Sequence, residues 1–292
     1  MITRRIVTQL PYPLRTQRDL SELYTPGVGD PARKIAQQPH LAYTLTNKRN
    51  LVAVVTNGTA VLGLGNLGPL AAKPVMEGKA ALFKRFAGID AFDLEIAETD
   101  PDKFIDIVAK LAPTFGGINL EDIAAPACFY IETELQKRLD IPVFHDDQHG
   151  TAIISGAALL NAVELVHKKM SQIKLVISGA GAAGIRCAEH YVRLGVQKKH
   201  IIMCDSHGII SKKRNHINQS KKQFAVARDG SLADAMIGAD VLVGVSAPNI
   251  VTEKMLLTMN DHPIVFALAN PDPEIRYPLA KRARRDILLA SG

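Results

Sequence analysis

The sequence predicts an α/β protein in which a mixed α/β domain, residues 1–150, precedes a Rossmann-like doubly wound parallel-sheet domain, residues 151–292. Two observations support this fold class. After residue 150, apolar strands and helices alternate regularly, which is typical of a parallel sheet. A glycine-rich stretch of the form GxGxxG also stands between one of these strands and a helix. Before residue 150, short apolar runs and helical patches are separated by Gly and Pro, which indicates a mixed domain.

The elements expected in the first domain are short. Strands are predicted over 51–55, 92–96 and 142–144, and helices over 102–111 and 131–139. In the second domain, a helix over 151–169 leads into the first strand of the parallel sheet. The further strands are expected over 174–178, 200–205, 240–245, 263–269 and 286–290. Between them we expect a helix ending near Gly195, a basic loop over 206–222, a short helix capped by Ser231 and a helix over 252–259.

The glycine-rich stretch is the predicted phosphate-binding turn. It directly follows the apolar strand KLVIS and opens a helix, so its backbone can approach a pyrophosphate at a helix N-terminus. A second strand ends in Asp205, 26 residues after Gly179, close to the spacing of a ribose-binding acid. The predicted cofactor-binding residues of this turn are Gly179, Ala180, Gly181, Ala182, Ala183 and Gly184.

The nucleotide itself stays open between NAD and NADP. Asp205 favours NAD, because a carboxylate accepts hydrogen bonds from the ribose and repels a 2′-phosphate. His207 and the basic residues 212–214 could instead neutralise that phosphate. A second GxGxxG match, residues 63–68, runs into Pro69, and no acid ends a strand at a suitable distance. We therefore interpret it as a glycine-rich turn of the first domain.

Bulk composition excludes several other classes. No apolar run is long enough to cross a bilayer, so no membrane partner is expected. The net charge is +6, but the basic residues are scattered, aromatic residues make up 5% and Trp is absent, so no nucleic-acid partner is predicted. The three cysteines lack metal-like spacing and the N-terminus has no apolar secretory core, which favours a cytoplasmic protein.

Two acidic pairs, residues 121–122 and 146–147, suggest a bound cation. Adjacent carboxylates repel each other when buried, and Mg²⁺ or Mn²⁺ prefers oxygen ligands. The alternative for the first pair is a solvated helix start. His145 and His149 have a spacing that would suit zinc on a helix, but Gly150 and the preceding strand argue against a helix there.

Seven stretches, in order, resemble the bacterial malic enzymes, and the resemblance runs from about Leu14 to the C-terminus. They are YTPGV (24–28), GTAVLGLGNLG (58–68), KPVMEGKAALFKRFAGID (73–90), PTFGGINLEDI (113–123), IPVFHDDQHGTA (141–152), SGAGAAG (178–184) and ALANPDPEI (267–275). This resemblance implies oxidative decarboxylation of L-malate to pyruvate and CO₂ with reduction of NAD(P)⁺. It also makes the first domain the substrate and metal domain.

The resemblance also implies residue roles. The metal ligands fall on Glu121, Asp122 and Asp147, with Asp146 orienting the ligands or the base. The general base falls on Lys79 and the general acid on Tyr24. A substrate and nicotinamide contact falls on Asn270. An arginine that binds substrate in the larger eukaryotic branch is replaced here by Ala60.

The family pattern continues beyond residue 292, so we expect a truncated C-terminus and either a homodimer or an assembly with a missing C-terminal piece. The alternative function is a catalytically incompetent remnant, or a nucleotide-binding or regulatory subunit. Retention of the predicted catalytic and metal residues favours the enzyme. An amino-acid dehydrogenase with the same domain order is disfavoured, since it would leave both acidic pairs unexplained.

Overall fold

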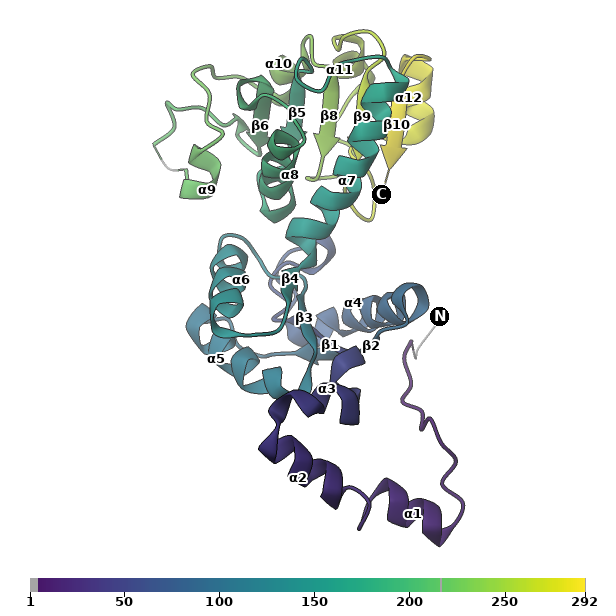
Figure 1. Cartoon of the computed structure of the whole chain (residues 1–292). Helices are drawn as coiled ribbons and strands as arrows, with labels where there is room; N and C mark the ends of the chain where they lie inside the picture. Colours follow the sequence, from purple (N-terminus) through teal and green to yellow (C-terminus); the bar gives the residue numbers. More distant parts are fainter. Residues whose placement is uncertain (1–4, 216, 292) are drawn as a thin grey trace. The chain divides into compact units, whose positions relative to one another are not determined.

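The computed structural model describes residues 5–215 and 217–291, and it forms two compact units, each built on its own β-sheet (Figure 1). The first unit ends at Phe144 and the second continues from His145. Two short segments, Leu62–Gly65 and Ala124–Phe129, belong to the second unit although they precede this point in the chain. Within the described ranges, no helix is long and apolar enough to cross a membrane.

The sheet of the first unit has four strands in the order β2-β1-β3-β4, and β1 pairs in parallel with both β2 and β3. Its strands are β1 (Leu51–Thr56), β2 (Asp90–Glu95), β3 (Gly117–Leu120) and β4 (Val143–His145). Its helices are α1 (Gln17–Leu23), α2 (Gly29–Gln37), α3 (Ala42–Leu45), α4 (Pro69–Leu82) and α5 (Pro101–Leu111), and α6 (Ala127–Arg138) begins in a segment of the second unit. Strand β3 was not among the predicted strands.

The sheet of the second unit has six strands in the order β10-β9-β8-β5-β6-β7, parallel except for the short β7. Its strands are β5 (Leu175–Ser178), β6 (Ile201–Asp205), β7 (Gly208–Ile209), β8 (Val241–Gly244), β9 (Ile264–Ala267) and β10 (Leu288–Ser291). Its helices are α7 (Asp146–Leu165), α8 (Ala182–Arg193), α9 (Gln219–Lys222), α10 (Leu232–Met236), α11 (Glu253–Leu257) and α12 (Tyr277–Ala283). The predicted α/β class with a parallel sheet is confirmed.

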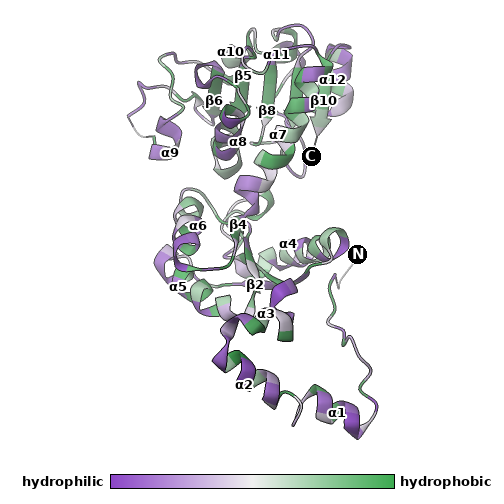
Figure 2. Cartoon of the chain, viewed as in Figure 1, coloured by the Kyte–Doolittle hydropathy of each residue, from purple (hydrophilic) through white to green (hydrophobic). Residues whose placement is uncertain are grey.

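The central strands of this sheet are buried on both faces. Every residue of β5, β8 and β9 is buried, and Figure 2 shows β5 and β8 in the green of hydrophobic residues. A strand covered on both faces carries no polar alternation, which is why these runs were recognisable as continuous apolar stretches. Ser231 caps α10 by accepting a hydrogen bond from the Asp234 amide, as its capping-box sequence predicts.

The predicted start of the helix after residue 150 is wrong. Helix α7 begins at Asp146, directly after β4, and His145 is its N-cap residue. Gly150 lies inside the helix: a Cβ at this position would come within 2.3 Å of Asp146 Oδ1. The glycine therefore makes room for a carboxylate instead of ending the helix. Two acids in the first turn also interact favourably with the positive end of the helix dipole.

The N-terminal segment packs loosely. No residue in the range 5–50 is buried, although this range contains α1, α2 and α3. Large apolar side chains are exposed there, including Leu20, Leu23 and Val28. Capping, not burial, supports α1, since Thr16 and Asp19 form a reciprocal capping box.

Candidate functional site

The three glycines of residues 179–184 differ in what a side chain at each position would meet. Gly179 has φ +112°, and a Cβ there would lie 2.4 Å from the carbonyl oxygen of Val245. A Cβ on Gly184 would lie 1.8 Å from the carbonyl oxygen of Gly179, so this glycine lets α8 pack closely on β5. A Cβ on Gly181 would meet nothing within 4 Å, so this position is open for a ligand to approach the backbone.

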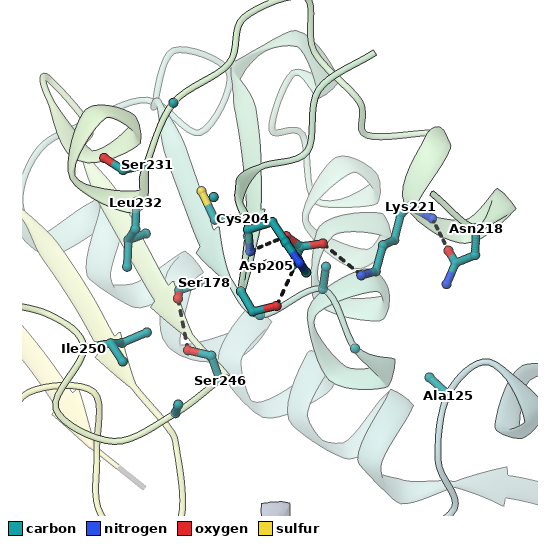
Figure 3. A pocket seen from close by; sticks show the side chains of 18 residues that line it. Ala125, Ser178, Cys204, Asp205, Asn218, Lys221, Ser231, Leu232, Ser246 and Ile250 are labelled. Carbon is teal, nitrogen blue, oxygen red and sulfur yellow. Dashed lines mark hydrogen bonds and ion pairs between the residues drawn. The ribbon is translucent and has the colours of Figure 1, made fainter. Parts of the chain in front are cut away.

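A cavity of about 1250 Å³ opens at this turn, within the second unit (Figure 3). Its floor is formed by residues 178–181, and Gly181 is the N-cap of α8 and makes no side-chain cap. The first amides of α8 can therefore donate hydrogen bonds to a phosphate. Ser178 and Ser246 both line the cavity, and their hydroxyl oxygens form a hydrogen bond at 3.0 Å.

Asp205 also lines this cavity, at the end of β6, the strand that pairs with β5 next to the turn. Its Oδ1 accepts hydrogen bonds from Arg214 Nη1 at 2.8 Å and from the backbone amide of His207 at 3.0 Å. Its Oδ2 accepts from Lys221 Nζ at 3.0 Å, a contact drawn in Figure 3. Burial raises the pKa of Asp205, but the hydrogen bonds from Arg214 and Lys221 outweigh it and lower the pKa to about 2.

The first unit brings Lys79 and Glu121 together. Lys79, in the last turn of α4, places its Nζ 3.2 Å from Glu121 Oε1. Asn119 Nδ2 donates to the other oxygen, Glu121 Oε2, at 2.8 Å. The Glu121 side chain is only 7% exposed and that of Lys79 22%, so the ion pair is largely removed from water. Sequence reasoning missed Asn119, which lies on β3 two residues before Glu121; in an extended chain, side chains two residues apart point to the same face.

Glu121 and Asp122 directly follow β3 and are both buried, so the alternative of a solvated helix start is wrong. The Glu121 amide donates to Val55 O at 2.9 Å, and Ala60 N donates to Asp122 O at 3.0 Å. Asp122 has φ +54°, a conformation that costs energy in a residue with a side chain. The backbone is thus held in a strained position that presents two adjacent carboxylates.

Asp147 belongs to the second unit, on the first turn of α7. Its Oδ2 lies 3.1 Å from Nε2 of the fully buried His145, and Gln148 Nε2 lies 2.7 Å from His145 Nδ1. Arg186 donates to Gln148 Oε1 at 2.8 Å. The role of His145 and Gln148 in orienting Asp147 was not predicted, because it depends on the helix starting at Asp146.

The predicted metal ligands therefore come from both units: Glu121 and Asp122 from the first and Asp147 from the second. Among residues 5–215 and 217–291, no group of three His, Cys, Asp or Glu side chains is arranged to hold a metal ion. The donor set is nevertheless suited to a hard cation, since it consists of carboxylate oxygens. The burial of Glu121 and Asp122 also fits, because neighbouring buried carboxylates repel each other without a positive charge.

Tyr24 and Asn270 both lie in exposed positions. Tyr24 is the C-cap residue of α1 and is 67% exposed. Asn270 follows β9 and donates weakly, at 3.4 Å, to Leu268 O. Its loop is anchored by the buried Glu274, whose carboxylate accepts from the amides of Ser246 at 2.9 Å and Ala269 at 3.1 Å.

The parallel sheet, the three glycines and the acid ending β6 define the second unit as a Rossmann-type dinucleotide-binding domain. Two family profiles cover most of the chain. The malic enzyme N-terminal domain matches residues 3–101 and 93–136, and the malic enzyme NAD-binding domain matches residues 148–284. The chain belongs to the malic enzyme family.

Individual relatives agree with this assignment. The chain is 56% identical to the NADP-dependent malic enzyme of Escherichia coli (strain K12), over 96% of this chain and 37% of that protein. It is 50% identical to the NADP-dependent malic enzyme of Halomonas elongata, over 100% of this chain and 69% of the relative. The crystal structure of the NAD-dependent malic enzyme from Thermotoga maritima superposes with a TM-score of 0.93 at 45% identity, covering 99% of this chain and 78% of that one. The chain thus spans little more than a third of the length of several relatives.

Proposed function

We propose that this chain carries the substrate, metal and dinucleotide sites of a malic enzyme, which converts L-malate to pyruvate and CO₂ while reducing NAD⁺ or NADP⁺. The observation that carries the proposal is the Lys79–Glu121 ion pair beside the buried Asp122. A basic group and two carboxylates, largely shielded from water, stand together at the end of a parallel strand. Ligands of α/β proteins commonly bind at the carboxyl ends of such strands.

In this proposal, Lys79 is the general base. Malate must lose the proton of its C2 hydroxyl as the C2 hydride moves to the nicotinamide. The Lys79 amine can accept that proton only after the ammonium that pairs with Glu121 has been deprotonated. Glu121, with Asn119 behind it, fixes the position of the Lys79 amine. Loss of the C4 carboxylate as CO₂ then leaves the enolate of pyruvate. Tyr24 donates the proton that C3 requires, and Asn270 contacts the substrate and nicotinamide.

Glu121, Asp122 and Asp147 would hold Mg²⁺ or Mn²⁺. Such an ion supplies Lewis-acid polarisation of the substrate's C2 oxygen when bound. His145 and Gln148 position Asp147 for this task, and Asp146 completes the acidic first turn of α7. The turn at residues 179–184 binds the pyrophosphate of the cofactor, and Asp205 lies at its adenosine end.

The test is turnover of L-malate by the purified chain with Mn²⁺ and NAD⁺ or NADP⁺, followed by absorbance at 340 nm. Loss of a general base typically reduces the rate by about 10²–10⁴-fold, so the turnover rate of the Lys79→Ala variant should be lower than that of the parent by this factor. Chelation of the metal with EDTA should abolish turnover, and added Mn²⁺ should restore it.

Lys84→Ala is the matched control. Lys84 lies five residues further along the same helical segment, but its side chain is 63% exposed and pairs with Asp90. Its replacement should leave the rate within about two-fold of the parent, since exposed ion pairs contribute little. Equal rates for the Lys79→Ala variant and the parent would reject Lys79 as the base. Folded protein without turnover would favour the non-catalytic alternative.

We further propose a homodimer in the cytoplasm. The exposed apolar side chains of the N-terminal segment support self-association, because apolar surface of this kind is commonly covered by a partner. The three cysteines, all buried free thiols, support a reducing compartment. Light scattering coupled to size-exclusion chromatography would measure the mass in solution, and a monomer would reject the dimer.

A further inference from the structure

Glu274 is a fully buried glutamate that joins the carboxyl ends of β8 and β9. Its Oε1 accepts hydrogen bonds from the amide of Ser246 at 2.9 Å and from the Ser246 hydroxyl at 3.2 Å, and Ser246 lies two residues after β8. Its Oε2 accepts from the amide of Ala269 at 3.1 Å, two residues after β9. One side chain thus ties together the loops that follow these two neighbouring strands.

The contacts of Glu274 require an acidic side chain at this position. An ionised carboxylate accepts on both of its oxygens, whereas the amide of a glutamine would present an NH₂ group to one of the donors. The three donors carry no charge, so hydrogen bonds alone offset the cost of burying this carboxylate. Gly244 makes room for it, because a Cβ there would lie 2.3 Å from Glu274 Cδ. The sequence therefore provides both space and donors for a buried charge.

The contacts of Glu274 also fix the direction of the hydrogen bond between Ser178 and Ser246. An ionised carboxylate can only accept, so the single hydroxyl hydrogen of Ser246 points to Glu274. The Ser246 oxygen then accepts the hydrogen of Ser178 Oγ, 3.0 Å away (Figure 3). Both serines line the cavity at the glycine-rich turn. Glu274 lies behind this lining and sets the orientation of two of its hydroxyls.

The Ser178–Ser246 hydrogen bond lies where a dinucleotide would cross the sheet. In the strand order β10-β9-β8-β5-β6-β7, the chain continues from β5 to β6 on one side and later to β8 on the other. Ligands of doubly wound sheets bind outside the carboxyl ends of the strands at such a point. Asp205, at the end of β6, marks the adenosine side of β5. The ends of β8 and β9 are therefore left for the nicotinamide nucleoside.

We propose that Glu274 is a positioning residue for the nicotinamide half of the dinucleotide site. It holds the loop at Ser246 and the loop at Ala269 and Asn270 in fixed positions, and it orients the hydroxyls of Ser246 and Ser178. It acts through these groups and does not itself contact the cofactor. The inference rests on the proposed dinucleotide-dependent function and extends it to a residue outside the cavity lining.

The test compares a reduced dinucleotide with its own adenosine fragment, so it needs neither malate nor metal. The dinucleotide is whichever of NADH and NADPH binds the parent chain more tightly. The fragment is ADP for NADH or adenosine 2′,5′-bisphosphate for NADPH, and calorimetry measures the affinity of the whole chain for each ligand. We expect Glu274→Gln to weaken dinucleotide binding about ten-fold, the scale of one misplaced hydrogen bond, and to leave fragment binding within about two-fold of the parent.

Glu253→Gln is the matched control. Glu253 lies on α11 of the same unit, but its side chain is 37% exposed and pairs with Arg282. This variant should bind both ligands as the parent does.

Ser246→Ala tests the same contact from the other side. It removes no buried charge, so it should fold even if Glu274→Gln does not. It should also weaken only dinucleotide binding. The double variant should lose less affinity than the two single effects combined, because both act through one hydroxyl.

Thermal unfolding of each variant, followed by circular dichroism, establishes that it is folded. A folded Glu274→Gln variant that binds both ligands like the parent, or weakens both equally, would overturn this inference alone. Unchanged dinucleotide binding in Ser246→Ala, or fully additive effects in the double variant, would do the same. Failure of a folded parent chain to bind either ligand would overturn the proposed dinucleotide function as well. Selective loss of dinucleotide affinity in both single variants would establish Glu274 as the positioning residue.

Discussion

Replacement of Gly184 by alanine should separate the packing role of the glycine-rich turn from its binding role. The added Cβ would lie 1.8 Å from the carbonyl oxygen of Gly179, whereas real Cβ atoms essentially never approach closer than 3.0 Å. The required displacement is therefore at least 1.2 Å, the difference between the two distances. Because the opposing atom belongs to the backbone, no side-chain rotation can relieve the contact.

The displacement has to be taken up by α8 or by the turn itself. Helix α8 buries Ile185, Cys187, Ala188 and Tyr191 in the core, so moving it opens gaps along its whole inner face. We expect a loss of about 3 kcal/mol in the free energy of unfolding, the upper range for overpacking a core. For a unit of this size, that corresponds to a fall of roughly 6–12 °C in the melting temperature.

The assay is thermal unfolding by circular dichroism, combined with calorimetric titration of adenosine 2′,5′-bisphosphate. Gly181→Ala is the control, since a Cβ there meets nothing within 4 Å and its φ of −87° is open to any residue. It should cost about 1 kcal/mol or less, the typical effect of losing an N-cap glycine, yet weaken nucleotide binding. A Gly184→Ala variant with the same melting temperature as the parent would refute the packing argument.

Three further predictions follow from single contacts. Asp286 forms an ion pair with Arg284 that lowers its pKa to about 2, so Asp286→Asn should cost about 1 kcal/mol at pH 7. Since the folded pKa lies below the unfolded value, this stability is present above about pH 4 and is lost as the pH falls toward 2, where the melting temperatures of the two proteins should converge. Glu274→Ala leaves the amides of Ser246 and Ala269 without their acceptor, so it should lower the free energy of unfolding by about 3 kcal/mol. An unchanged melting temperature in thermal unfolding would contradict this prediction. Gly150→Ala should leave stability within about 1 kcal/mol, because alanine favours a helix, but should displace Asp146 and reduce Mn²⁺-dependent turnover; unchanged turnover would show that Asp146 is dispensable.

The second unit was largely predictable from sequence, because its signals are local. Buried parallel strands appear as continuous apolar runs, and the glycines of residues 179–184 mark a turn whose geometry is nearly invariant. The first unit was harder. Strand β3 is four residues long and begins with Gly117, so neither length nor alternation distinguishes it from a loop. Its position in the sheet is fixed by pairing with β1, a contact that no local pattern contains.

The candidate site could be predicted only in part, because sequence patterns identify residue types but not the tertiary contacts that those residues make. The types of the acidic residues indicated a cation, but burial of Glu121 and the contact from Asn119 depend on tertiary packing. Gly150 was misinterpreted because a glycine that ends a helix and one that clears space for Asp146 have the same sequence signature. Lys221 contacts Asp205 from sixteen residues further along the chain, beyond β7 and on α9, and no local sequence pattern predicts such a contact.

The uncapped start of α8 links folding to nucleotide supply. Gly181 provides no side-chain acceptor for the first amides of this helix, so the pyrophosphate of the proposed cofactor would act as its cap. A ligand that completes the folded state adds RT ln(1 + [L]/Kd) to its stability, about 2.7 kcal/mol at a hundred-fold excess over Kd. The lifetime of the protein against proteolysis should therefore rise and fall with the concentration of free nucleotide, so that the chain persists longest where its cofactor is abundant.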